Sequence, residues 1–282
     1  MIYALSGELS APVHAMTRGE RGEVSAYIEG LRVSANGVSD AISKVAKLCR
    51  GKVTANEDGG YYIHLPDYGK GVVYEVKDVA ERDETVSIST GNTKMGNISS
   101  VSLPPIDTCP SCECNKKCYA AKLAKIRPNV RACWQKNLDI LTGNPQEYWK
   151  QVEASIRVSR FFRFHVSGDI PNWQYLTEMV RCARRNPHCD ILCFTKRYKY
   201  VNDYLAHVSG FPENLHIILS GWRGLEMENP HQLPEAHVIY RDKTTTARDD
   251  AIVCKGNCTS CAKAGEGCWS LKPGQQVVFH EH

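Results

Sequence analysis

Residues 161–197 read FFRFHVSGDIPNWQYLTEMVRCARRNPHCDILCFTKR, and this stretch decides the fold. It contains an apolar, β-like run at Phe161–Val166, a helical stretch at Trp173–Arg185 and a second β-like run at Asp190–Phe194. A strand, a helix and a strand in this order are typical of a parallel sheet covered by helices. The stretch therefore predicts an α/β protein.

The same alternation continues on both sides of this stretch. Five or six strand–helix units are too few to close an eight-stranded barrel. We therefore predict an α/β fold with a partial (β/α) barrel or an open α/β sheet. The other expected strands are Ile98–Leu103, Leu215–Leu219, His237–Tyr240 and Ala251–Cys254, and the other expected helices are Asn129–Leu141, Pro145–Ser159, Tyr200–Val208 and one that begins at about Lys117.

Residues 1–84 lack the regular strand–helix alternation of the rest of the chain and predict a small α+β module. Residues 85–282 then form the (β/α) domain. A helix is expected at Asn36–Cys49, followed by strands at Tyr61–Leu65 and Gly71–Val76. The sequence of this module contains no catalytic motif. We interpret it as an accessory unit or as a binding unit for a protein partner.

The composition excludes several classes of protein. Hydrophobic residues make up 42% of the 282 positions and charged residues 23%, which is typical of a globular chain and excludes general disorder. The net charge of +4 is not gathered into a basic run, so nucleic acid is not an expected partner. No apolar stretch approaches the ~20 residues of a membrane helix, and the N-terminus lacks the pattern of a signal peptide. We expect a cytoplasmic protein without a membrane partner.

Cysteine is the residue whose placement is most unusual. There are 13 cysteines, and eight of them form two dense groups. In a reducing compartment such groups hold metal more often than they form disulfides. The spacing leaves iron–sulfur and zinc open as alternatives for both groups. The first group is Cys109, Cys112, Cys114 and Cys118, the second is Cys254, Cys258, Cys261 and Cys268, and the other five, predicted to be small buried residues, are Cys49, Cys133, Cys182, Cys189 and Cys193.

Polar residues follow the predicted strands at their carboxyl ends, where parallel sheets carry ligand sites. Lys196 is a candidate nucleophile that would form a Schiff base, with a salt bridge or an anion clamp as the alternative. Asp169 is a candidate general base or amine ligand, with capping of the next helix as the alternative. His165 is a candidate catalytic residue, with a core position as the alternative. The expected substrate-binding residues are Ser167, Arg223 and Arg241.

The chain carries, in this order, Ser89–Gly96, Ser102–Pro104, Cys109–Ala120, Arg131, Asn137, His165–Asp169, Thr195–Lys196, Cys258–Cys261 and Cys268–Trp269. This series resembles the phage gene product eighty-eight domain family over about residues 85–269. The family is largely phage-encoded and is similar in fold to radical S-adenosylmethionine enzymes. The resemblance therefore implies a radical-S-adenosylmethionine-like fold, an iron–sulfur cluster more than zinc, and a location in the host cytoplasm.

The two cysteine groups leave the state of the cluster open. The family pattern uses three cysteines in the first group, best matched by Cys109, Cys114 and Cys118, so that Cys112 is an addition. If all four bind one cluster, no iron is open to S-adenosylmethionine. If three bind, the fourth position is open or is filled from the second group. The second group contains the Cys-x3-Cys-x2-Cys spacing of radical S-adenosylmethionine enzymes, but its C-terminal position favours a chance match.

These observations predict an iron–sulfur protein with one or two [4Fe–4S] clusters that acts as an enzyme on a small anionic or carbonyl substrate. Two chemistries compete: a lyase or aldolase-type reaction through Lys196, and radical-S-adenosylmethionine-like redox chemistry that requires an open iron. The alternative from another class is a zinc-stapled, non-enzymatic binding module that engages a host protein through residues 1–84.

Overall fold

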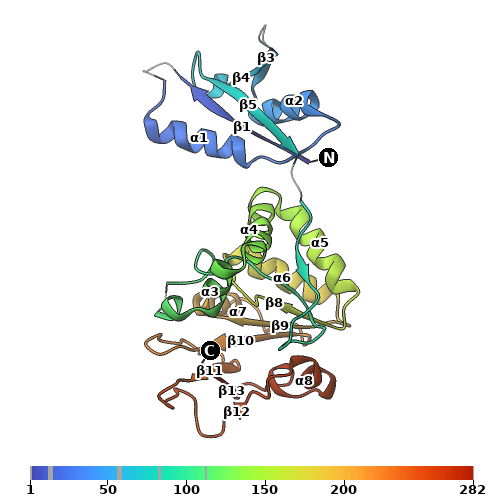
Figure 1. Cartoon of the computed structure of the whole chain (residues 1–282), viewed down its shortest axis with the longest axis vertical. Coiled ribbons are helices and arrows are strands. Elements are labelled where there is room, and N and C mark those ends of the chain that lie inside the picture. Colours follow the sequence, from blue (N-terminus) through green and yellow to red (C-terminus); the bar gives the residue numbers. More distant parts are fainter. Residues whose placement is uncertain (1, 12–14, 56–58, 82–83, 112, 282) are drawn as a thin grey trace. The chain divides into compact units, whose positions relative to one another are not determined.

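The structure of the chain is a computed structural model that describes residues 2–11, 15–55, 59–81, 84–111 and 113–281. The chain divides into two compact units, one made of residues 1–85 and 139–147 and the other of residues 86–138 and 148–282 (Figure 1). Each unit has a sheet of its own, and we describe the two separately.

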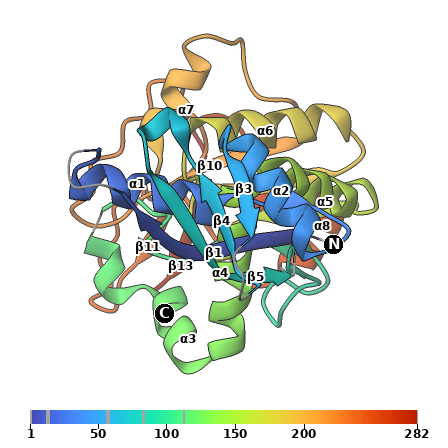
Figure 2. The ribbon, with the colours of Figure 1, turned by 90° about the horizontal axis from the view of Figure 1, so that it is seen from above.

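The N-terminal unit is built on an antiparallel sheet with the strand order β2-β1-β5-β4-β3 (Figure 2). Ile28 and Ile42, from the two helices, are fully buried in one core with Ile63 and Tyr74 of the sheet, so the unit is α+β. Its elements are β1 (Ile2–Ser10), α1 (Arg18–Gly30), β2 (Val33–Ser34), α2 (Val38–Leu48), β3 (Lys52–Ala55), β4 (Tyr61–His64), the 3-10 turn η1 (Pro66–Tyr68) and β5 (Val73–Glu81).

Helix α1 and strand β1 were not predicted from the sequence. The helix has two glycines in its first half and few apolar residues, so its hydrophobic periodicity is weak. It begins at a capping box: the Thr17 hydroxyl accepts from the Glu20 N–H at 3.2 Å, and the Glu20 carboxylate accepts from the Thr17 N–H at 2.7 Å. Val24 and Ile28 then bury one face. Local capping and two buried side chains form a helix that periodicity alone does not reveal.

The larger unit contains a sheet with the strand order β12-β13-β11-β10-β9-β8-β7-β6. All neighbouring pairs are parallel except β6 and β7, which are antiparallel. The strands are β6 (Ile88–Ser89), β7 (Ser99–Val101), β8 (Phe161–Phe164), β9 (Asp190–Thr195), β10 (Leu215–Ser220), β11 (Glu235–Ile239), β12 (Ile252–Val253) and β13 (Gln276–His280).

One face of this sheet is covered by helices. Phe164 of β8 is fully buried and packs against Trp149 and Tyr175, at ring-centroid distances of 6.0 and 6.1 Å. These two partners belong to α5 and α6, which lie on the same side of the sheet in Figure 1. The helices are α3 (Tyr119–Ile126), α4 (Pro128–Gly143), α5 (Pro145–Arg157), α6 (Trp173–Arg185) and α7 (Tyr198–Leu205), and the 3-10 turn η2 (Glu113–Lys117) precedes them.

The opposite face is covered by the cysteine-rich C-terminal segment, which contains α8 (Cys258–Ala264) and the 3-10 turn η3 (Gly267–Trp269). Trp269 is buried in one cluster with Leu192, Ile218 and Val277 of three different strands. In Figure 1, α8 lies on the far side of the sheet from α5 and α6. The unit is therefore mixed α/β, with a curled sheet that forms a half-barrel. Its likeness to radical S-adenosylmethionine enzymes stays a prediction.

Strand β13 was not predicted, although it lies between β12 and β11 inside the sheet. Its apolar run is short and follows the glycine-rich cysteine segment, so the sequence pattern indicates a strand there only weakly. Its residues pair in register with β11, from Gln276 opposite Glu235 to His280 opposite Ile239. The last strand of the chain therefore completes the sheet that the earlier strands begin.

Candidate functional site

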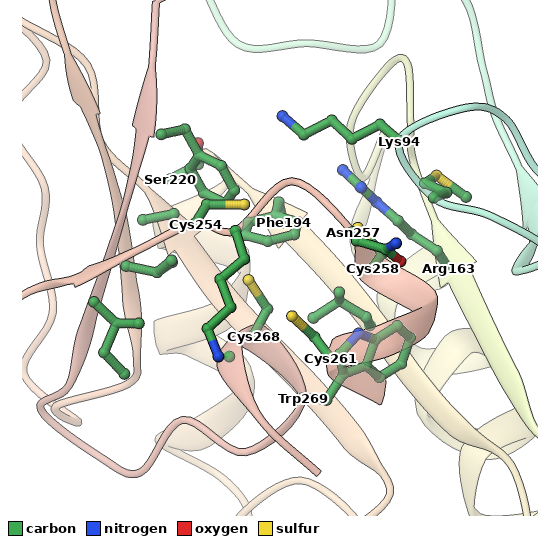
Figure 3. A pocket seen from close by; sticks show the side chains of 18 of the residues that line it. Lys94, Arg163, Phe194, Ser220, Cys254, Asn257, Cys258, Cys261, Cys268 and Trp269 are labelled. Atoms are coloured by element: carbon green, nitrogen blue, oxygen red, sulfur yellow. The ribbon is translucent and has the colours of Figure 1, made fainter. Parts of the chain in front are cut away.

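A cavity of about 990 Å³ lies where the C-terminal cysteine segment meets the sheet (Figure 3). Its walls come from β8 to β13, from the turn around residues 92–95 and from the segment 252–272. Phe194, Phe279 and Trp269 give it apolar, aromatic sides. Cavities of this size are typical of sites for cofactors and small molecules.

All four cysteines of the second group line this cavity. Cys258 and Cys261 lie one turn apart on α8, while Cys254 follows β12 and Cys268 lies in η3. Figure 3 shows the sulfurs of Cys254, Cys261 and Cys268 turned toward one shared space. The four cysteines that the sequence grouped by spacing are thus grouped in space, and all four are free thiols.

Two backbone features bring these cysteines together. Asn257 caps α8, since its side-chain oxygen accepts from the Ser260 N–H at 3.0 Å. Gly265 ends the helix in the left-handed conformation, with a φ of 63°. The chain therefore reverses after one short helix, and Cys268 returns to the cavity beside Cys261.

The four thiols influence one another electrostatically. Burial raises the pKa of Cys268 to about 12, and Cys254, Cys258 and Cys261 act in the same direction, while Arg163 opposes them. Burial also raises the pKa of Cys258, again opposed by Arg163. Without a further positive charge Cys258 and Cys268 hold their protons at neutral pH, so their thiolate forms require a cation such as a metal. Among the described residues, however, no three His, Cys, Asp or Glu side chains are arranged to hold a single metal ion.

The turn at residues 92–97 holds the cysteine helix against the sheet. The N–H of Cys258 donates to the carbonyl oxygen of Lys94 at 3.1 Å, and the Thr259 hydroxyl donates to that of Met95 at 2.7 Å. The N–H of Asn97 donates to the same Thr259 hydroxyl at 3.2 Å. Gly96 faces Thr259 so closely that a Cβ would lie 2.2 Å from its hydroxyl oxygen. The sequence motif Ser89–Gly96 thus has a physical role, which is to hold this helix.

The first cysteine group lies elsewhere in the same unit. Cys109 is close to Asp169, Lys196 and Cys118; burial, then Asp169, raises its pKa to about 11. Cys118 caps α3, its sulfur accepting from the Ala121 N–H at 3.5 Å. Cys114 is disulfide-bonded, and Cys112 lies outside the described residues. Cys109, Cys114 and Cys118 do not line the cavity of the second group.

Asp169 and Lys196 meet at the carboxyl ends of neighbouring strands. The buried Asp169 carboxylate accepts from the Thr195 hydroxyl at 2.6 Å, the Lys196 N–H at 2.9 Å and the Ile170 N–H at 2.7 Å. Burial raises the pKa of this carboxyl group above its ordinary value. Asn172, and not Asp169, caps the next helix. The Lys196 ammonium donates to the Ser220 hydroxyl at 3.2 Å.

His165 follows β8 directly and adopts a left-handed conformation with a φ of 61°. It is 4% exposed and lines the cavity, and neither ring nitrogen has a hydrogen-bond partner within the part of the chain that the structure describes. Burial lowers its pKa to about 3, so the imidazole is neutral. Ser167 is also buried, and its hydroxyl likewise has no partner among the described residues.

The two arginines that the sequence assigned to substrate binding lie outside this cavity. Arg223 pairs with Asp242 at 2.8 Å and lies over the ring of Tyr240. The backbone N–H of Arg241 donates to Glu281 at 3.0 Å. The cations that line the cavity are Lys94, Arg163, Lys255 and Lys272.

Arg163 was missed by the sequence analysis, although the strand FFRF carries a signal for it. Residues at alternate positions of a strand point to opposite faces, so Arg163 points away from the face of its two neighbours Phe162 and Phe164. On β8 that face is the cavity, while Phe162 and Phe164 enter the helix-covered core. Cys133, predicted to be buried, is instead exposed on α4.

A mixed α/β unit with a cysteine-lined cavity on one face of its parallel sheet defines the class of this protein. Residues 77–269 match the family described as Gene product 88, and the chain belongs to this family. The match confirms the phage family expected from the motifs. No curated protein and no solved structure shows a significant match. Among the described residues, no helix is both long and apolar enough to cross a membrane.

Proposed function

We propose that this chain is an iron–sulfur protein whose cluster is held by Cys254, Cys258, Cys261 and Cys268. The observation that carries the proposal is that these four free thiols, which lie within fifteen positions of sequence, all line one cavity. An all-thiolate donor set suits iron–sulfur clusters, and the cluster supplies electron-transfer chemistry.

We propose a cluster in preference to a single zinc ion. Four cysteine thiolates suit either group. The motifs shared with the phage family imply iron–sulfur more than zinc.

The residues around the thiols support such a site. Arg163 supplies a positive charge beside Cys258 and Cys268, which favours their deprotonated forms. The buried Trp269 contacts Phe161 and His216 with ring centroids 5.4 and 6.2 Å away, and it forms one apolar side of the cavity. With all four cysteines on iron, no iron is left for S-adenosylmethionine, so we favour electron transfer over radical chemistry. The disulfide bond of Cys114 contradicts its predicted role as a metal ligand in the first cysteine group, so we propose no second cluster there.

Metal and sulfide analysis of protein purified without oxygen tests this proposal. We expect iron and acid-labile sulfide in equal amounts, and a large loss of both in C258S and in C268S. The matched control is C133S, because Cys133 is exposed and lies outside both groups. C109S reports separately on the first group. Colourless protein that carries zinc would instead support the zinc-stapled binding module.

The Lys196 side chain favours a second candidate function, a lyase that acts on a carbonyl substrate. Its ammonium contacts the Ser220 hydroxyl and forms no ion pair with a described residue. The neutral amine of a lysine attacks a carbonyl group to form a Schiff base. Asp169, which accepts from the backbone N–H of Lys196 at 2.9 Å, is the candidate base.

A further inference from the structure

The cavity carries an excess of positive charge. Among the residues that the structure describes, four cationic side chains line it, against a single carboxylate, that of Glu266. Lys255 pairs with Glu266 at 2.8 Å. Lys94, Arg163 and Lys272 have no carboxylate at ion-pair distance among the residues that the structure describes. An uncompensated group of cations around a partly apolar cavity favours a bound anion.

Aromatic rings, and not carboxylates, hold two of these cations in place. The Arg163 guanidinium lies 5.0 Å from the ring centroid of Phe194, and the Lys94 ammonium lies 5.4 Å from that of Phe279. The two rings pack edge to face with centroids 5.7 Å apart. Cation–π contacts position a charge without neutralising it. One packed pair of rings therefore places two free positive charges at the same side of the cavity, as Figure 3 shows for Lys94 and Arg163.

A polar atom without a partner lies at the same wall. The Nε of Arg163 is buried and has no hydrogen-bond partner among the described residues. Such a group costs free energy unless a partner binds it, so it favours a ligand that accepts a hydrogen bond there.

We propose that this cavity binds a small organic anion whose carboxylate or phosphate group lies between Lys94 and Arg163. The apolar body of the ligand packs against Trp269, Phe194 and Phe279. The two arginines predicted from the sequence play no part in this site.

This inference rests on the cavity and not on the proposed cluster. A cluster bound by four thiolates is itself an anion, and Arg163 lies near enough to Cys258 and Cys268 to balance part of its charge. In its oxidised state a four-thiolate [4Fe–4S] cluster carries two negative charges, fewer than the three cations without an ion pair, so in that state positive charge remains for a ligand. If the cations served the cluster alone, the cavity would show no preference for an anionic ligand.

Isothermal titration calorimetry on the anaerobically purified full chain tests the proposal with three probes of similar shape. The acids 2-naphthoate and 2-naphthyl phosphate carry the charge, and neutral 2-naphthamide is the matched control. We expect at least one acid to bind about tenfold tighter than the amide, because charge-assisted hydrogen bonds are the strong ones.

Variants then assign the preference to residues. R163Q and K94M each reduce the ratio of acid affinity to amide affinity by about tenfold. R163K, which keeps the charge, retains most of this ratio. The control is K263M, since Lys263 is exposed on α8 and does not line the cavity. Equal affinity for all three probes, or a preference unchanged in both R163Q and K94M, overturns the proposal.

Iron analysis of the same samples separates the two proposals. Protein that prefers the acids but carries no iron supports the anion site and contradicts the iron–sulfur proposal. Protein that carries iron but binds acid and amide equally supports the cluster and overturns the anion site.

Discussion

The side-chain hydroxyl of Thr259 donates a hydrogen bond to the carbonyl oxygen of Met95 at 2.7 Å, across 164 positions of sequence. The same hydroxyl accepts from the N–H of Asn97. Helix α8, which carries Thr259, has only seven residues, and so short a helix is not stable alone. The cysteine group therefore depends for its geometry on a turn near the beginning of the unit.

Substitution of Gly96 by alanine tests this dependence. Gly96 has a φ of 65°, and an added Cβ would lie 2.2 Å from the Thr259 hydroxyl oxygen. The left-handed backbone alone costs an alanine about 1–2 kcal/mol, and the clash adds to this cost. We expect G96A to lower the free energy of unfolding and to lose bound metal.

The matched control is G224A. Gly224 has a similar φ of 75° but nothing within 4 Å of the added Cβ, so it reports the backbone cost without a clash. Chemical unfolding and metal analysis of both variants give the comparison. Equal loss of stability in the two variants, with metal retained in G96A, would contradict the role of the turn.

The sequence predicted those elements and site residues whose structure depends on interactions between neighbouring positions. Helix α6 begins and ends at the predicted residues, because the Asn172 cap and a strongly amphipathic pattern are written in consecutive positions. The grouping of Cys254 and Cys268 was predictable from spacing for the same reason. The position of Arg163 in the cavity was not predictable from sequence spacing. It depends on the contact with Phe194 of the neighbouring strand and on Cys268, about a hundred residues later in the chain.

Substitution of Asp169 by asparagine should destabilise the larger unit. All three groups that contact the carboxylate are donors, from Thr195, Lys196 and Ile170, so an amide places its NH2 against a donor. A buried unsatisfied donor costs about 1–3 kcal/mol. The measurement is urea unfolding of D169N, with D203N as control because Asp203 forms only an exposed pair with Lys199. Equal stability of the two variants would show that the contacts of Asp169 carry no weight.

The same carboxyl group gives a pH dependence of known sign. Burial raises the pKa of Asp169 in the folded chain above its ordinary value of 3.8, so the folded state keeps a proton that the unfolded state releases. The contribution of this group to the free energy of unfolding therefore falls as the pH rises from 3.8 through the folded pKa. D169N lacks this contribution. The difference between the free energies of unfolding of the parent chain and D169N, measured across acid pH, therefore reports the titration of Asp169.

His165 has the opposite dependence. Burial lowers its pKa from 6.5 to about 3, so below pH 6.5 the unfolded chain binds a proton that the folded chain does not. Stability then falls with decreasing pH by about 1.4 kcal/mol per pH unit from this residue. Asparagine tolerates the left-handed conformation of this position and does not titrate there. We expect the stability difference between H165N and the parent to shift in favour of H165N on acidification; parallel curves would show that His165 is not buried in its neutral form.

A chemical trap examines the proposed amine nucleophile at Lys196. The Lys196 ammonium contacts the Ser220 hydroxyl at 3.2 Å, whereas Lys199, one turn further along on α7, pairs with Asp203 at 2.8 Å. The Asp203 carboxylate raises the pKa of Lys199, whereas Lys196 forms no ion pair with a described residue. With pyruvate as the carbonyl probe and cyanoborohydride as the reductant, we therefore expect an adduct at Lys196. Peptide mass mapping locates it, K196M removes it and K199M leaves it unchanged. Adducts spread evenly over the exposed lysines would remove Lys196 as a nucleophile, and its contact with Ser220 would then be structural.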